Sequence, residues 1–140
     1  MIQRQQTLWL LLATATAILS FMFPFATGTE LVEKTAMERP AEIIAGDNFF
    51  TLLLTIASVT LSTITIFLFK NRKQQMWLCV LGMLLSGLII FIYVTQMNKL
   101  IKPVPALSAV LPAISLFAFI MALRGIRKDE KLVKSLDKLR

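Results

Sequence analysis

The sequence predicts an all-α membrane protein, in which four transmembrane helices form an antiparallel bundle and an amphipathic C-terminal helix follows in the cytoplasm. Two observations lead to this fold class. The 140-residue chain is 56% hydrophobic, with a mean hydropathy of +0.73, whereas typical soluble domains are about 45–50% apolar. The apolar residues also gather into four runs without any Asp, Glu, Lys, Arg or His: Leu8–Ala26, Phe49–Phe69, Met76–Thr95 and Val104–Leu123.

The length of each run matches a membrane crossing. A helix needs roughly 20 residues, at ~1.5 Å each, to cross a hydrocarbon core ~30 Å thick. A helix in a soluble core would be shorter and would carry a polar stripe. We therefore expect a transmembrane domain of residues 1–123, with spans at about residues 8–26, 49–69, 76–95 and 104–123.

The first run has a second interpretation, because "MIQRQQTLWLLLATATAILSFMF" imitates a secretory signal peptide. Its apolar part exceeds the ~7–15 residues that are usual in a signal. Pro24 also stands where a cleavage site after Ala26 would need a small residue. We predict an uncleaved first span and keep the signal peptide as the alternative.

The distribution of Lys and Arg predicts the orientation, since cytoplasmic flanks of membrane spans are enriched in these residues. With four spans, both chain ends share one side with the turn "FKNRKQQMW", and that side holds eleven basic residues against four on the other. Both termini are therefore expected in the cytoplasm and Thr27–Asn48 outside. The short turns "FKNRKQQMW" and "TQMNKLIKPVP" make spans two, three and four antiparallel neighbours.

A basic tail, residues 124–140, follows the last span. Its sequence predicts a helix, because Glu130 and Lys134 stand at i, i+4 in the favourable order and no proline interrupts it. Gly125 predicts a bend between span and tail. One face of this helix is apolar and is a candidate docking face, made of Leu132, Leu136 and Leu139.

Two uses of the leucine face stay open. It can pack against the protein's own cytoplasmic turn or the lipid headgroups, or it can dock a partner. Nucleic acid is not an expected partner, because acidic residues that repel phosphate are interleaved with the basic ones. The lipid bilayer is the expected partner, together with another membrane protein or a second copy of this chain.

The second span carries a stripe of hydroxyl side chains at 4, 3, 4, 3 spacing: Thr51, Thr55, Ser58, Ser62 and Thr65. A packing interpretation bonds each hydroxyl to its own helix or to a neighbouring helix. A pathway interpretation lines a route for a solute with the same groups. Packing is favoured, because Ser and Thr are normal interface residues between membrane helices.

Catalysis is not expected, and no cofactor or metal is predicted. The chain has no histidine and one cysteine, Cys79, so zinc, haem and iron–sulfur sites lack their usual ligands. The predicted spans contain no Asp, Glu, His, Lys or Arg, although proton relays and ion-coupled transporters place such residues inside the membrane. The acids of the outer loop and tail are expected to lie in water.

The two ends, "MIQRQQTLWLLL" and "RGIRKDEKLVKSLDKLR", resemble a family of small four-span inner-membrane proteins from Bacteroidetes-type bacteria, described as a domain of unknown function. The resemblance covers the whole chain and implies a bacterial cytoplasmic (inner) membrane location, but no activity and no catalytic residues. The predicted function is that of a non-catalytic accessory or structural subunit acting through helix–helix contacts. The alternative is a small transporter or channel that uses the hydroxyl stripe.

Overall fold

The described part of the chain consists of helices and one small sheet, in a computed structural model that describes residues 2–31, 38–68 and 70–139, with the backbone alone at residues 2–4 and 31. The α-helices are α1 Ile2–Leu19, α2 Phe49–Phe67, α3 Arg72–Met97 and α4 Val110–Lys138. The strands are β1 Ala26–Leu31, β2 Glu38–Ile43 and β3 Val104–Pro105, and the 3₁₀ turn η1 Leu107–Ala109 precedes α4.

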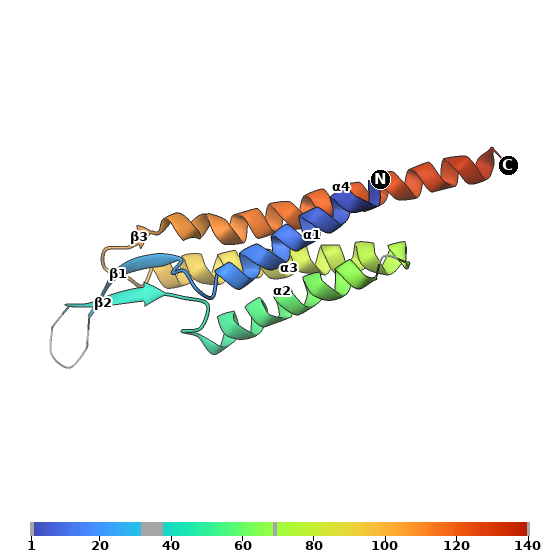
Figure 1. Ribbon diagram of the computed structural model, residues 1–140. Helices are drawn as coiled ribbons and strands as arrows, with labels where there is room; N and C mark the ends of the chain where they lie inside the picture. Colours follow the sequence, from blue (N-terminus) through green and yellow to red (C-terminus); the bar gives the residue numbers. More distant parts are fainter. Residues whose placement is uncertain (1, 32–37, 69, 140) are drawn as a thin grey trace.

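The helices pack side by side and alternate in direction along the chain (Figure 1). Helix α1 packs against α2 and α4, and α3 packs against the same two helices from the other side. The prediction of a mostly helical chain with helices in these four regions is confirmed. We refer to α1–α4, up to Asp129, as the helical body.

The first and last helices differ most from the apolar runs. Helix α1 begins at Ile2 and ends at Leu19, and after Pro24 the chain enters β1 at Ala26. Val104 is extended in β3, so that α4 begins only at Val110.

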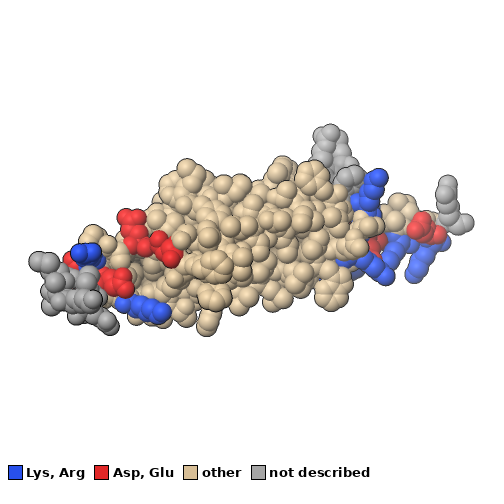
Figure 2. All heavy atoms as spheres, turned by 90° about the horizontal axis from the view of Figure 1, so that it is seen from below, with Lys and Arg blue, Asp and Glu red and all other residues tan. Residues whose placement is uncertain are grey.

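Within the described residues, three helices are long and apolar enough to cross a membrane: Phe49–Phe67, Arg72–Met97 and Leu107–Lys138. The apolar part of α1, Gln5–Leu19, is shorter. On the face seen in Figure 2, charged residues lie at the two ends of the molecule and the long middle has none. Large apolar side chains such as Phe67 and Phe91 are exposed, as expected for a surface that faces lipid. The length and composition of these three helices indicate a membrane protein, and the four-span topology stays a prediction.

The expected all-α architecture was wrong in one respect, because a three-stranded antiparallel sheet, in the order β2-β1-β3, caps one end of the helical body. Strand β1 is central: it pairs with β2 from Ala26↔Ile43 to Leu31↔Glu38, and with β3 through Ala26↔Pro105 and Thr27↔Val104. The prolines of β2 and β3 are accommodated because both are edge strands, where an amide donor is dispensable.

Gly28 in the centre of β1 explains how the α3–α4 connection fits over the sheet. A Cβ atom at this position would lie 3.0 Å from Leu100 Cδ1 and 3.1 Å from the Lys102 carbonyl oxygen. The connection also bonds to β1 directly, since the Ile101 amide donates to the Thr29 carbonyl at 3.0 Å. The sheet thus joins the loop after α1 to the loop before α4.

Two apolar clusters form the core. One lies between α1, α3 and α4 and consists of Leu10, Ala13, Cys79, Ala118, Phe119, Ala122, Leu123 and Ile126. The other lies next to the sheet and consists of Ala26, Ile43, Ala45, Ile89 and Tyr93. Phe25 stacks on Tyr93 with ring centroids 4.5 Å apart, which fastens the loop after α1 to α3.

The bend predicted at Gly125 was wrong, because α4 continues without interruption from Val110 to Lys138. Gly125 is needed for close packing instead: a Cβ atom there would lie 2.9 Å from Cγ of Gln6 on α1. The end of α4 therefore runs straight on past the other helices (Figure 1). We call residues 130–139 the arm.

Candidate functional site

The hydroxyl stripe of α2 faces the interior of the helical body. The side chains of Thr51, Thr55, Ser58, Ser62 and Thr65 are each at most 2% exposed. Their 4, 3, 4, 3 spacing places them on one helical face. The structure brings the whole stripe together on the buried face of α2.

Hydrogen bonds within α2 occupy most of the stripe. Thr55 donates to the Thr51 carbonyl at 2.7 Å and Thr65 to the Leu61 carbonyl at 2.6 Å. Ser62 donates to the Val59 carbonyl at 2.9 Å and accepts from Thr14 of α1 at 2.8 Å. These bonds satisfy hydroxyls inside a helix interface without any solute.

A small cavity lies beside the stripe. Its volume is about 10 Å³, which is close to the least that holds one water molecule. Ala17, Ile89 and Pro112 line it together with six residues that carry hydroxyl groups: Thr16, Ser20, Thr55, Ser58, Ser86 and Ser115. The cavity is thus suited to a single water rather than to a larger solute.

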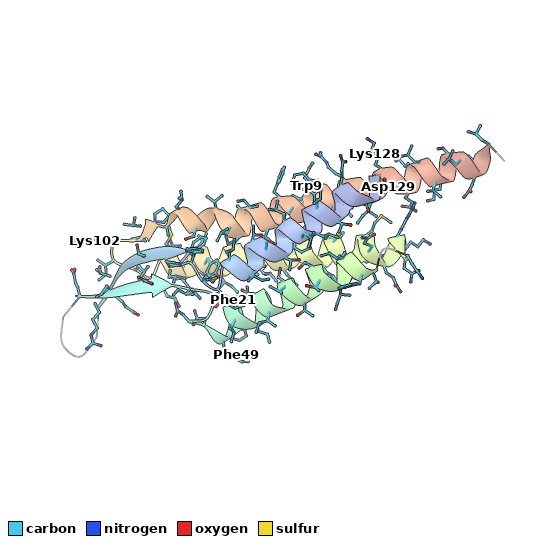
Figure 3. All side chains as sticks on the ribbon, in the orientation of Figure 1. Trp9, Phe21, Phe49, Lys102, Lys128 and Asp129 are labelled. Carbon is cyan, nitrogen blue, oxygen red and sulfur yellow. The ribbon has the colours of Figure 1, made fainter. Side chains whose placement is uncertain are left out.

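Asp129 was misjudged from the sequence, which placed the tail acids in water. Its side chain is 7% exposed and lies on the side of α4 that faces the other helices, opposite Lys128 (Figure 3). The Gln6 amide donates a hydrogen bond to Asp129 Oδ2, and Arg72 Nη1 donates to the Asp129 carbonyl at 3.2 Å. Oδ1 is buried and has no hydrogen-bond partner among the described residues.

A periodic signal for this burial was present in the sequence. The buried residues of α4 follow 4, 3, 4, 3 spacing through Ser115, Phe119, Ala122, Ile126 and Asp129. Asp129 therefore continues the inward face of α4 by one more turn. It joins α1, α3 and α4 at the end of the helical body that carries both chain termini.

The candidate docking face lies on the arm. Exposure rises along it, from 42% at Leu132 to 65% at Leu136 and 85% at Leu139. The predicted pair of Glu130 and Lys134 is confirmed as an ion pair of 2.8 Å. The hydrogen bond from Lys134 lowers the pKa of Glu130, and the charges of Lys134, Lys73 and Arg72 act in the same direction.

Basic residues surround two hollows at the same end of the helical body. One, of about 620 Å³, lies between the turn at residues 70–74 and the start of the arm. The other, of about 540 Å³, lies between α3 and α4, and Lys73 lines both. Among the described residues, no group of three or more His, Cys, Asp or Glu side chains is placed to hold a metal ion.

Comparisons with known proteins identify a family but no activity. Searches of curated proteins and of solved structures find no match. The sequence model of a family described as "Domain of unknown function (DUF4293)" matches residues 2–139, which is nearly the whole chain. The match agrees with the resemblance of the two chain ends to a domain of unknown function. The chain therefore belongs to the DUF4293 family.

Proposed function

We propose that this protein is a non-catalytic accessory or structural subunit of the bacterial cytoplasmic membrane, which holds a partner protein through its arm. The observation that carries the proposal is the exposure of Leu136 and Leu139 on a helix that extends past the rest of the molecule. An apolar face on a charged helix is suited to a contact that covers it.

The proposed topology has four spans and cytoplasmic termini. The excess of Lys and Arg on the side of both chain ends supports this orientation. Helix α1 has 18 residues, or ~27 Å at ~1.5 Å each, which suits a thin or locally thinned bilayer. The arm then points from the membrane into the cytoplasm, because it continues the axis of the fourth span.

This direction favours a protein partner over the lipid surface for the leucine face. An interfacial helix lies in the membrane plane with its apolar face in the headgroup layer, whereas the arm prolongs α4 in a straight line. Lys131 and Lys138 border the leucines on one side of the helix. The partner that fits is a helix with an apolar stripe and acidic flanks.

The absence of catalysis is part of the proposal. The chain contains no histidine, and its cysteine, Cys79, is fully buried in an apolar cluster. Asp129 is buried between Gln6 and Arg72, where its oxygens serve packing of three helices. A helical body without candidate catalytic groups would act through contacts that its surface makes with other molecules.

The alternative function is passage of a small solute along the hydroxyl stripe, and the small cavity between the helices is the observation in its favour. The two functions differ in what mutation does. Replacing Thr55 and Thr65 by Val should leave a packing seam almost intact, since such hydroxyls average ~0.6 kcal/mol each. The same changes should abolish flux through a pathway in proteoliposomes.

Site-specific photocrosslinking in cells tests the docking proposal. A photoreactive residue at Leu136 should capture one partner, and the captured peptide should be a helix with an apolar stripe and acidic flanks. The same residue at Asp137, one position away and on the other side of the helix from the leucines, should capture it far less. Point substitutions are preferable to truncation after Arg127, because truncation also removes Asp129 and its bond to Gln6.

A matched pair of double variants completes the test. Leu132→Ala with Leu136→Ala should release the partner during purification in mild detergent. Lys134→Ala with Asp137→Ala, on the side of the arm opposite the leucines, keeps the net charge and the helix propensity and should retain most of it. Equal retention by both variants, with solute flux in liposomes that depends on the stripe, would overturn the accessory function in favour of transport.

A further inference from the structure

A groove between α3 and α4 has the layered chemistry of a phospholipid. Its volume is about 540 Å³, and its lining residues are Lys73, Met76, Trp77, Val80, Leu123 and Arg127. It opens on the outer surface of the molecule, where Trp77 is 72% exposed, while Leu123 is 8% exposed and forms part of its buried wall. No acidic residue lines it.

Along the helix axes, the polarity of these residues falls in the same order as the polarity along a lipid molecule, from its headgroup to its acyl chain. Lys73 and Arg127 stand at the end of the groove that lies next to the chain termini, one on each helix. Trp77 lies ~6 Å deeper along α3 than Lys73, and Val80 lies ~10 Å deeper, at ~1.5 Å per residue. The order from cations through an indole to aliphatic side chains matches the order of headgroup, interfacial region and acyl chain in a lipid.

Within the part of the chain that the structure describes, neither cation forms an ion pair, although the charge of Lys73 contributes to lowering the pKa of Glu130. The ion pair found at this end joins Glu130 to Lys134, both of which line the neighbouring hollow. Asp129, the acid closest to Arg127 in sequence, is buried and accepts from Gln6. Lys73 and Arg127 therefore present net positive charge to whatever occupies the groove.

We propose that the groove between α3 and α4 binds one anionic phospholipid, whose phosphate contacts Lys73 and Arg127 and whose acyl chain lies along Trp77, Val80 and Leu123. Charge complementarity selects an anionic headgroup, and the apolar floor selects a lipid over a soluble phosphate. The site depends on insertion of α3 and α4 in a membrane, and it is independent of the arm and its leucines.

Native mass spectrometry of the full-length protein in mild detergent tests this proposal, with phosphatidylglycerol and phosphatidylcholine of the same acyl chains as probes. The protein should retain one phosphatidylglycerol in clear preference to phosphatidylcholine. Each cation near an anionic headgroup contributes about a fivefold preference. Lys73→Gln with Arg127→Gln should therefore lower the preference about 25-fold.

The control removes the same charge from the same end of the molecule. Arg124 and Lys128 are exposed and do not line the groove, and Lys128 lies on the far side of α4 (Figure 3). Arg124→Gln with Lys128→Gln should keep the preference, and circular dichroism should show equal helix content in both double variants. Trp77→Ala should weaken retention of both lipids, because it removes part of the wall beside the acyl chain.

Three results would overturn the proposal. One is equal retention of the two lipids by the unmodified protein. Another is an equal loss of preference in both double variants, which would indicate diffuse attraction by the whole basic end. The third is retention of phosphatidylglycerol that Trp77→Ala leaves unchanged while inorganic phosphate displaces the lipid, which would indicate an anion site without an acyl groove.

Discussion

Replacing Gly82 by Ala tests how closely α3 and α4 pack. A Cβ atom at Gly82 would lie 2.5 Å from Cε1, 2.7 Å from Cζ and 2.8 Å from Cδ1 of Phe119. Ordinary carbon contacts are about 3.5–4.0 Å, so the ring would have to move by about 1 Å. Phe119 is fully buried among Ala118, Ala122 and Cys79, and this surrounding leaves little room for the movement.

The magnitude follows from two opposing effects. Overpacking of this kind costs about 1–3 kcal/mol of the free energy of unfolding. Replacing a glycine by alanine inside a helix contributes about 0.5–1 kcal/mol in the other direction. Gly87→Ala isolates the second effect, because a Cβ atom at Gly87 meets nothing within 4 Å. We expect the Gly82→Ala variant to be about 1–3 kcal/mol less stable than the Gly87→Ala variant.

Unfolding in mixed micelles with increasing sodium dodecyl sulfate provides the measurement. Cys79 is fully buried, so the rate of its labelling by a maleimide reports opening of the α1–α3–α4 core. Phe119→Leu should restore part of the stability lost in Gly82→Ala, since a smaller side chain makes room for the methyl group. Equal stability of the two alanine variants, or no rescue by Phe119→Leu, would refute the packing described here.

Two further predictions concern the polar junction and the topology. Gln6→Leu alone should destabilise the protein by about 1–3 kcal/mol, because it leaves the buried Asp129 without its donor. Adding Asp129→Leu should recover much of this loss in the same unfolding assay, and a further loss would argue against the junction. In a background without Cys79, a cysteine at Ser135 should resist an impermeant maleimide in intact cells, whereas one at Glu42 should react. Labelling of position 135 from outside would contradict cytoplasmic termini.

The helices and the buried hydroxyl face were predictable from local pattern. Long uncharged runs determine that α2 and α3 are apolar helices, because such segments bury their backbone hydrogen bonds internally. The spacing from Thr51 to Thr65 determines that these hydroxyls share a face, since a helix repeats every 3.6 residues. Only packing decided that this face turns inward, where Ser62 meets Thr14 of α1.

The environment of the C-terminal charges could not be predicted by composition alone. Asp129 and Lys128 are neighbours in the sequence, but the side chain of Asp129 is buried and that of Lys128 is exposed. The difference arises because α4 continues through Gly125 without a bend, so the inward face of the span extends to Asp129. Gln6, more than a hundred residues away in sequence, supplies the hydrogen bond that makes this burial tolerable.

The sequence by itself determined an apolar, uncharged middle with basic residues concentrated towards one end, because hydropathy and charge are properties of each segment. Tertiary structure alone decided the sheet and the groove. Strand β3 has two residues and no strand pattern of its own; it exists because Val104 and Pro105 meet β1 across the chain. The groove likewise exists only because α3 and α4 pack together and bring Lys73 and Arg127 to the same end of it. Contacts between segments that are distant in the chain leave no periodic pattern in the sequence of either segment.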